Sequence, residues 1–239
     1  MNPTGLYTAR ADDGSLALMD TRTGRGWWRF LDRTGAQLWN KLTTGTDPDT
    51  AVAELAAFWA QRGADPERVR ADLQALLAAL TDADLLRPTA AADGRPAPEV
   101  FCTAARPVRM RERAAGAAGF ALALLILRCL PIRTTIAVAR SAARLPGRTA
   151  HAGQARNLFE AVSAVGRRWP GRSACLEESL GTYLAAALLG RRLQWVLGAR
   201  FAPNGAHAWV EAGGAAVGQD ASDRVGPYTP ALRIGTDTD

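Results

Sequence analysis

A thiol and an imidazole in the second half of the chain could together form a nucleophilic site. Cys175 is one of three cysteines in 239 residues, and it opens the stretch "CLEESLGTYLAAALLG". The apolar spacing of this stretch predicts a helix that ends at Gly190. A thiol at the start of a helix meets the positive end of the backbone dipole, which favours the reactive thiolate. Taken alone, a single cysteine is more often a small buried residue.

His207 is one of two histidines, and the pattern around it predicts the middle strand of a sheet. In this strand His207, Trp209 and Glu211 alternate onto one face, and Val210 with two alanines lies on the other. We expect the helix that starts at Cys175 to pack on the first face, so that the thiol approaches the imidazole. The predicted strands are residues 193–201, 206–212 and 215–220, joined by the turns "APNG" and "GG".

A carboxylate beside the imidazole would complete a catalytic triad. The third predicted strand brings Asp220 alongside His207, where an acid fixes the ring tautomer and stabilises the imidazolium. Asp223 and Glu211 are the alternatives, although Glu211 lies about 13 Å along the strand at roughly 3.3 Å per residue. The imidazole would take the thiol proton and return it to a leaving amine. The backbone N–H of Cys175 is the expected oxyanion donor.

The composition is typical of a folded protein without a metal site. Apolar residues make up 48% of the chain and charged residues 22%, which is ordinary for globular domains. Sparse cysteines indicate a reducing compartment rather than a disulfide scaffold. No spacing of cysteine and histidine resembles a zinc site, and no glycine-rich phosphate loop occurs. We therefore expect no cofactor.

The N-terminus and the longest apolar run together predict a cytoplasmic protein. The opening "MNPTGLYTARADDGS" has no basic patch followed by an apolar core, so it is not a secretory signal. The apolar run Ala114–Leu127 has 14 residues, fewer than the roughly 18 of a membrane span. We expect this run to form a buried helix of the second domain, with contact at a membrane surface as the alternative.

A segment rich in proline and glycine divides the chain. "RPTAAADGRPAPE" predicts a linker, so we expect domains at residues 1–88 and 106–239 with a linker at 89–105. In the first domain, "SLALMD" and "RGWWRFLD" belong to a predicted antiparallel meander. Three helices follow, two of which start with an Asp-Pro pair that suits a helix N-terminus. The predicted helices are residues 34–45, 47–63 and 65–86.

The first half resembles the PqqD-like peptide-recognition domain, which is winged-helix-like, over residues 5–87. The resemblance rests on "LALMDTRTGRGWWRFLDRTGAQLWNKLTTG", "VAELAAFW" and "VRADLQALLAALTDADLL". It implies that a leader peptide adds as a strand to the sheet edge and packs against the third helix. The residues that it assigns to the leader are Gly26, Trp27, Trp28, Arg29, Phe30 and Leu31 on the edge, and Val69, Leu73, Leu76 and Leu77 on the helix.

A winged helix that binds nucleic acid is the competing interpretation of this layout. Contacts with phosphates need clustered cations. Residues 1–99 hold 11 basic against 14 acidic residues, whereas residues 100–239 hold 18 against 9. The third helix of the first half is itself acidic, so we expect no nucleic-acid partner.

The second half resembles the leader-peptide protease domain of lasso-peptide biosynthesis B proteins. The resemblance rests on "CLEESLGTYLAAALLGRRLQWVLGAR" followed by "AHAWVEAGGAAVGQD". It implies a papain-like or transglutaminase-like domain, with helices packed on an antiparallel sheet, so that the whole chain is α+β. It also implies cysteine endopeptidase activity at the leader–core bond, with Cys175, His207 and Asp220 as the triad. The implied partners are a lasso precursor peptide and a macrolactam cyclase similar to asparagine synthetase.

Two other functions stay open on the sequence. A non-catalytic scaffold would hold the leader and deliver the precursor to the cyclase. A thiol acyltransferase would resolve its thioester with an amine instead of water, and the same three residues would serve that reaction.

Overall fold

A computed structural model of the protein describes residues 5–87, 89–91, 96–97, 101–102, 107–171, 173–218 and 227–235. Helices and mainly antiparallel strands occur in both halves, which confirms the predicted α+β class. The strands are β1 (Leu6–Arg10), β2 (Leu16–Asp20), β3 (Trp27–Leu31), β4 (Ala90–Ala91), β5 (Phe101–Cys102), β6 (Arg148–Thr149), β7 (Arg191–Arg192), β8 (Gln194–Phe201), β9 (Asn204–Ala212), β10 (Ala215–Val217) and β11 (Thr229–Ile234). The helices are α1 (Arg33–Thr43), α2 (Pro48–Ala60), α3 (Pro66–Asp82), α4 (Met110–Cys129), α5 (Ile132–Ala143), α6 (Ala152–Gly166) and α7 (Cys175–Leu188).

The first sheet is the predicted meander with one added strand. β1, β2 and β3 pair antiparallel in chain order, and β4 pairs parallel with β1 on the far side. Among the described residues β3 is therefore an edge strand. Alternation along β2 sends Leu16 and Leu18 toward the helices of the first half, and sends Ala17 and Met19 toward the second half. Both faces of this sheet are consequently covered.

The first three helices start at capping aspartates. The side chains of Asp32, Asp47 and Asp65 accept hydrogen bonds from backbone N–H groups in the first turns of α1, α2 and α3. Pro48 and Pro66 occupy the next position in α2 and α3, where a missing N–H has no cost. Each such cap stabilises a helix by about 1 kcal/mol. The helix starts predicted from the Asp-Pro pairs are confirmed.

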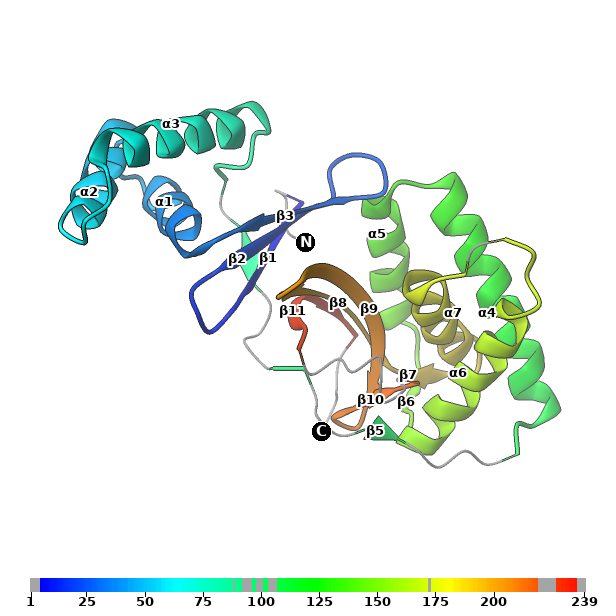
Figure 1. Ribbon diagram of the computed structural model, residues 1–239. Coiled ribbons are helices and arrows are strands. Elements are labelled where there is room, and N and C mark those ends of the chain that lie inside the picture. The colour runs from blue at the N-terminus through cyan, green and yellow to red at the C-terminus, as the bar shows by residue number, and fades with distance from the viewer. Residues whose placement is uncertain are drawn as a thin grey trace.

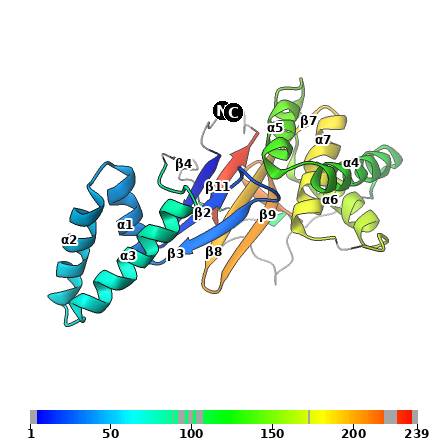
Figure 2. The same cartoon turned by 90° about the horizontal axis from the view of Figure 1, so that it is seen from above.

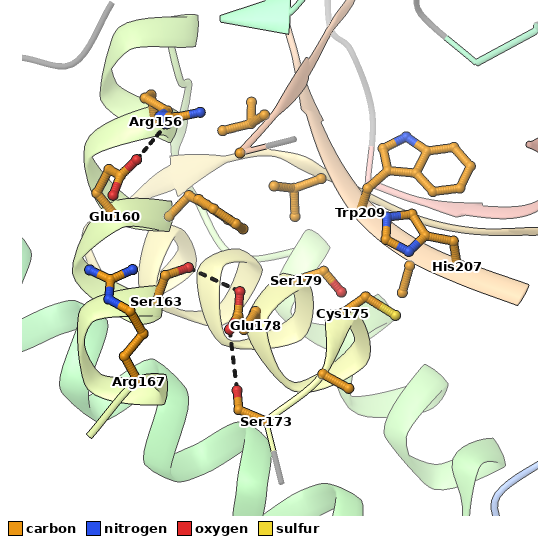
Figure 3. Close-up of a pocket in the computed structure, with 16 residues that line it drawn as sticks. Arg156, Glu160, Ser163, Arg167, Ser173, Cys175, Glu178, Ser179, His207 and Trp209 are labelled. Atoms are coloured by element: carbon orange, nitrogen blue, oxygen red, sulfur yellow. Dashed lines mark hydrogen bonds and ion pairs between the residues drawn. The ribbon is translucent and has the colours of Figure 1, made fainter. Parts of the chain in front are cut away.

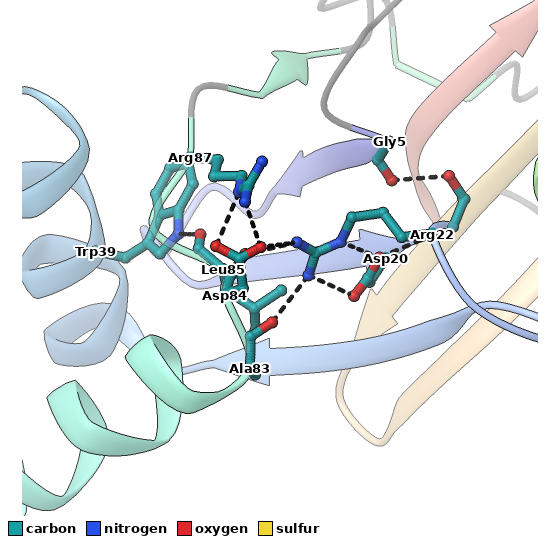
Figure 4. A network of polar contacts seen from close by, with 9 residues as sticks. Gly5, Asp20, Arg22, Trp39, Ala83, Asp84, Leu85 and Arg87 are labelled. Carbon is teal, nitrogen blue, oxygen red and sulfur yellow. Dashed lines mark hydrogen bonds and ion pairs between the residues drawn. The ribbon is translucent and has the colours of Figure 1, made fainter.

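A polar network fastens the end of α3 to the first sheet (Figure 4). The Arg22 guanidinium donates to both carboxylate oxygens of Asp20 at 2.9 and 2.8 Å, and to one of Asp84 at 2.8 Å. The indole Nε1 of Trp39 donates to the Leu85 carbonyl at 2.9 Å. The hydrogen bond from Arg22 lowers the pKa of Asp20, so this carboxylate stays ionised at neutral pH.

The second sheet is built around the hairpin of β8 and β9. Its strand order is β11-β8-β9-β10-β5. The strands predicted at 193–201 and 206–212 appear as β8 and β9, and β10 covers the first three residues of the strand predicted at 215–220. Helices α6 and α7 contact one face of this sheet, and α4 packs against both helices. A side chain on Gly119 of α4 would clash with the Gly181 carbonyl of α7, so glycine permits the close helix contact. Among the described residues, no helix is long and apolar enough to cross a bilayer.

The two halves share one hydrophobic core. Tyr7, Ala9, Ala17 and Met19 of the first sheet lie in the same buried cluster as residues of α4–α7 and β8–β11. Figures 1 and 2 show α1–α3 on one side, α4–α7 on the other, and the two sheets between them. The segment between the halves joins both sheets, because β4 pairs with β1 and β5 pairs with β10.

Candidate active site

Cys175 is the first residue of α7, as the sequence predicts. The preceding Ala174 is the N-cap residue and has an extended backbone. Its N–H donates to the Glu177 carboxylate at 3.1 Å, which ties the entering chain to the first turn. Cys175 is partly buried, with its side chain on the rim of the shared core.

His207 lies on β9 and is held by aromatic rings. Its side chain is 7% exposed. The imidazole is 6.0 Å from the Trp209 ring in a stacked arrangement and 5.0 Å from the Tyr228 ring. The Trp209 indole lies across Gly198, where an added Cβ would come within 2.7 Å of the ring. Rings packed in this way restrict the imidazole to few orientations.

The prediction that the helices pack on the His207 face of β9 is wrong. Ala208, Val210 and Ala212 of β9 lie in the cluster shared with the helices. Trp209 packs on the opposite face with Val196 and other residues. Both faces of β9 are buried from His207 onward, so alternation along the strand does not reveal which one the helices cover.

Cys175 and His207 nevertheless meet at one cavity of about 460 Å³. The four consecutive residues 207–210 of β9 all line it, so the cavity opens at the edge of this strand and is reached from both faces. Figure 3 shows the sulfur of Cys175 pointing toward the side of the cavity on which the His207 ring lies. The described residues that line the cavity are Arg156, Phe159, Glu160, Ser163, Arg167, Ser173, Ala174, Cys175, Glu178, Ser179, His207, Ala208, Trp209, Val210, Val217 and Gly218.

One helix that the sequence analysis did not predict forms the opposite wall. Arg156, Phe159, Glu160 and Ser163 follow one another at helical spacing on α6, and all face the cavity. Arg156 and Glu160 form an ion pair at 2.6 Å. Its other side carries buried apolar residues at helical spacing, and from this apolar stripe the sequence could have predicted the helix.

Glu178 joins α6, α7 and the segment before the nucleophile. Ser163 of α6 donates to one of its carboxylate oxygens at 3.0 Å, and Ser173 donates to the other at 3.3 Å. An added Cβ on Gly166 would lie 2.9 Å from the Ser173 hydroxyl oxygen, so glycine there leaves room for this contact. Figure 3 shows both hydrogen bonds, which are made by residues that line the cavity.

Comparison with protein-family models gives two matches. Residues 16–86 match coenzyme PQQ synthesis protein D (PqqD), and residues 117–233 match the transglutaminase-like superfamily. The chain joins a PqqD domain to a transglutaminase-like domain. PqqD domains bind precursor peptides of ribosomally made natural products, and the transglutaminase-like superfamily consists typically of cysteine-based hydrolases or transferases. Neither the curated proteins nor the solved structures compared with this chain give a match.

The acids considered for the triad differ in what the structure says of them. Asp220 and Asp223 lie outside the described residues. Glu211, on β9 of the transglutaminase-like domain, is 1% exposed and accepts a hydrogen bond from Trp209 Nε1 at 2.8 Å. It also lies 3.5 Å from the Arg233 guanidinium. Glu211 therefore belongs to the packing of the sheet face that carries Trp209. Among the described residues, no cluster of side chains could hold a metal ion.

The candidate leader-binding residues of the PqqD domain lie on both faces of β3 and on α3. Trp27 is 67% exposed, and it alternates with Trp28 and Phe30, which pack against the core shared with the transglutaminase-like domain. Gly26 precedes the strand with φ +82°. On α3, Leu73 is buried between helices. The remaining candidates are Arg29, exposed, Leu31, buried toward α1, and Val69, Leu76 and Leu77, partly buried on α3.

Proposed function

We propose that this protein is the leader peptidase of a lasso-peptide pathway. The PqqD domain binds the leader of the precursor peptide, and the transglutaminase-like domain hydrolyses the leader–core bond. One observation carries the proposal: a thiol at a helix start and a buried imidazole line one cavity, in a chain whose other domain belongs to a family that binds precursor peptides.

The chemistry follows from these two side chains. His207 takes the proton of Cys175, and the sulfur attacks the carbonyl carbon of the scissile bond. The oxyanion accepts a hydrogen bond from the backbone N–H of Cys175. The imidazolium gives its proton to the leaving amine, so the core peptide departs with a free N-terminus. Water, deprotonated by the imidazole, then cleaves the thioester and leaves the leader with a carboxylate.

We propose Asp220 as the acid that orients His207. In the antiparallel pair of β9 and β10, Val217 lies opposite Val210. In the sequence Asp220 follows Val217 by three residues and His207 precedes Val210 by three, so only a short span of chain separates each of them from this strand pair. Glu211 is already engaged by Trp209 and Arg233, and this engagement favours Asp220 over it.

The proposed leader site is the open edge of β3. An edge strand presents unpaired backbone N–H and C=O groups, to which an extended peptide can add as a further strand. Trp27 and Arg29 share the exposed face of β3 and would contact side chains of the leader. Because tethering raises the local concentration of the scissile bond, the protease cavity needs little affinity of its own.

The deciding experiment incubates the purified protein with the precursor encoded by a short open reading frame beside its gene. Mass spectrometry should show two linear products from one hydrolysed bond. Cys175→Ala should lower kcat/KM at least about 1000-fold and leave the Kd for the leader unchanged. Cys129→Ala, which removes an exposed thiol elsewhere, should cleave like the wild type.

Other outcomes identify the alternatives. A product that has lost water or ammonia without cleavage indicates acyl transfer. Leader binding with no cleavage, and no labelling of Cys175 by a thiol-directed electrophile, indicates a scaffold. A macrolactam cyclase similar to asparagine synthetase is the partner proposed for the freed amine, and co-purification with the cyclase encoded beside the gene tests it.

A further inference from the structure

The junction between the two domains is built as a fixed spacer. Two domains connected by a free linker move relative to one another unless their interface is large and apolar. Here the interface is part of the main core, where Tyr7 and Met19 are 4% and 3% exposed and lie in one cluster with Ile132 and Ile136 of α5. The Arg140 guanidinium also donates to the Tyr7 hydroxyl at 3.0 Å.

The edge strand of the PqqD domain takes part in this junction directly. The Phe30 ring of β3 packs edge-on against the Phe201 ring of β8 at 6.0 Å. The turn before β3 is bound as well, because the Ile132 N–H donates to the Gly24 carbonyl at 2.9 Å. Phe201 stands at the end of the hairpin whose second strand carries His207. The strand proposed to receive the leader thus touches the hairpin that carries the proposed base.

The connecting segment adds a second restraint. β4 is paired with the first sheet and β5 with the second. Between them, Ala97 is buried against Trp209, the neighbour of the imidazole, and the Pro96 carbonyl accepts a hydrogen bond from Arg233 at 2.9 Å. The described part of this segment is therefore held by both domains.

We infer that the protein selects its scissile bond by spacing. This inference rests on the proposed function. A leader fixed on β3 and a nucleophile fixed at the start of α7 are separated by a constant length, because one core holds both. In a leader segment that runs extended from β3 to the cavity, the bond that reaches Cys175 is then the one lying a set number of residues beyond the bound part.

The test uses precursor variants with the wild-type protein. Gly-Ser is inserted two residues before the scissile bond, so that the flanking residues are kept while the spacing grows by two. In an extended chain two residues move the bond by about 7 Å. We expect kcat/KM at the original bond to fall at least ten-fold, and a new cut to appear two residues closer to the leader. A two-residue deletion should move the cut the opposite way.

A flexible connection gives a different result. For a floppy tether the effective concentration falls roughly as the −3/2 power of length, so two added residues change the rate less than about two-fold. Cleavage that stays at the original bond with nearly unchanged kcat/KM would overturn the spacing mechanism but leave the peptidase intact. Absence of cleavage of any precursor would overturn the peptidase proposal, and the spacing mechanism with it.

A pair of enzyme variants sharpens the test. Phe201→Ala removes the ring that Phe30 contacts. Because Phe201 lies outside the PqqD domain, the Kd for the leader should stay at the wild-type value. The preference of this variant for the native over the lengthened precursor should shrink from at least ten-fold to about three-fold or less. Phe58→Ala removes a comparable edge-on aromatic contact on α2, with Trp59, and should keep the full preference. If Phe201→Ala does not fold, the precursor series still decides.

Discussion

Two strand edges in this molecule are arranged for opposite purposes. β3, at the margin of the first sheet, keeps Trp27 and Arg29 exposed. β9 is paired with β10 only from Val210 onward in the described residues, and its edge beyond that point carries His207 among buried rings. An edge that recruits a partner strand needs free backbone groups and accessible side chains. An edge that performs chemistry needs a side chain held in one place.

The largest effect is expected from the edge of β9. His207→Ala should reduce cleavage at least about 1000-fold, because the thiol loses its base and the leaving amine its acid. Leader affinity, measured by fluorescence anisotropy, should be unchanged. His151→Ala removes the other histidine, which is exposed, and serves as the control. Comparable loss in both variants would contradict the assignment.

A smaller effect is expected from Glu178, which anchors the segment before Cys175. Glu178→Ala removes the acceptor of Ser163 and Ser173, so the segment before Cys175 loses its anchor. We expect kcat to fall about ten-fold with KM little changed, since the leader supplies most of the binding. Glu178→Gln keeps one acceptor oxygen and should recover part of the rate. A pure change in KM would instead place Glu178 in contact with the substrate.

The edge of β3 should respond in binding and not in chemistry. Arg29→Glu reverses an exposed charge on the strand proposed to receive the leader, and a roughly ten-fold rise in Kd is expected. The rate at which iodoacetamide labels Cys175 should not change. Arg111→Glu makes the same charge change at an exposed residue of α4 and should leave the Kd unchanged. An equal rise in Kd for this variant would indicate a general electrostatic effect.

The smallest effect concerns the tie between the first sheet and α3. Asp20→Asn weakens the hydrogen bonds from Arg22, at a cost of about 1–2 kcal/mol at pH 7. The pKa of Asp20 lies below its ordinary 3.8 in the folded protein, because Arg22 binds the carboxylate. Its stabilising contribution is therefore complete above that value and is lost as pH falls through the folded pKa. Urea unfolding at pH 7 and near pH 2 should show the difference from wild type shrinking; a difference that persists would contradict this account.

Local signals in the sequence were enough for much of the fold. The Asp-Pro pairs at residues 47 and 65 predicted two helix starts because capping is a short-range interaction. The β8–β9 hairpin followed from strand residues around a short turn. Local patterns placed Cys175 at the start of a helix and His207 on a strand, and the family resemblance supported pairing them as catalytic residues. Both side chains line the cavity, although their catalytic roles stay predictions.

The features that the sequence did not reveal depend on distant contacts. β4 and β5 are two residues each, and only their partners β1 and β10 make them strands. Alanine, proline and glycine in that segment favour a linker by composition alone. The two faces of β9 are equally buried, so the pattern could not tell which one the helices cover. α6 is different, because Leu158, Ala161 and Val162 belong to a buried apolar stripe at helical spacing that could have predicted it.

The shared core also bears on how such a protein could be divided. A chain cut between β4 and β5 would yield two pieces, each with an apolar surface around Tyr7 and Met19 or around Ile132 and Ile136 left in water. Such pieces would be subunits of an obligate heterodimer, each prone to aggregate when produced without the other. Exchange of one piece for that of a distant homologue would require both surfaces to be changed together.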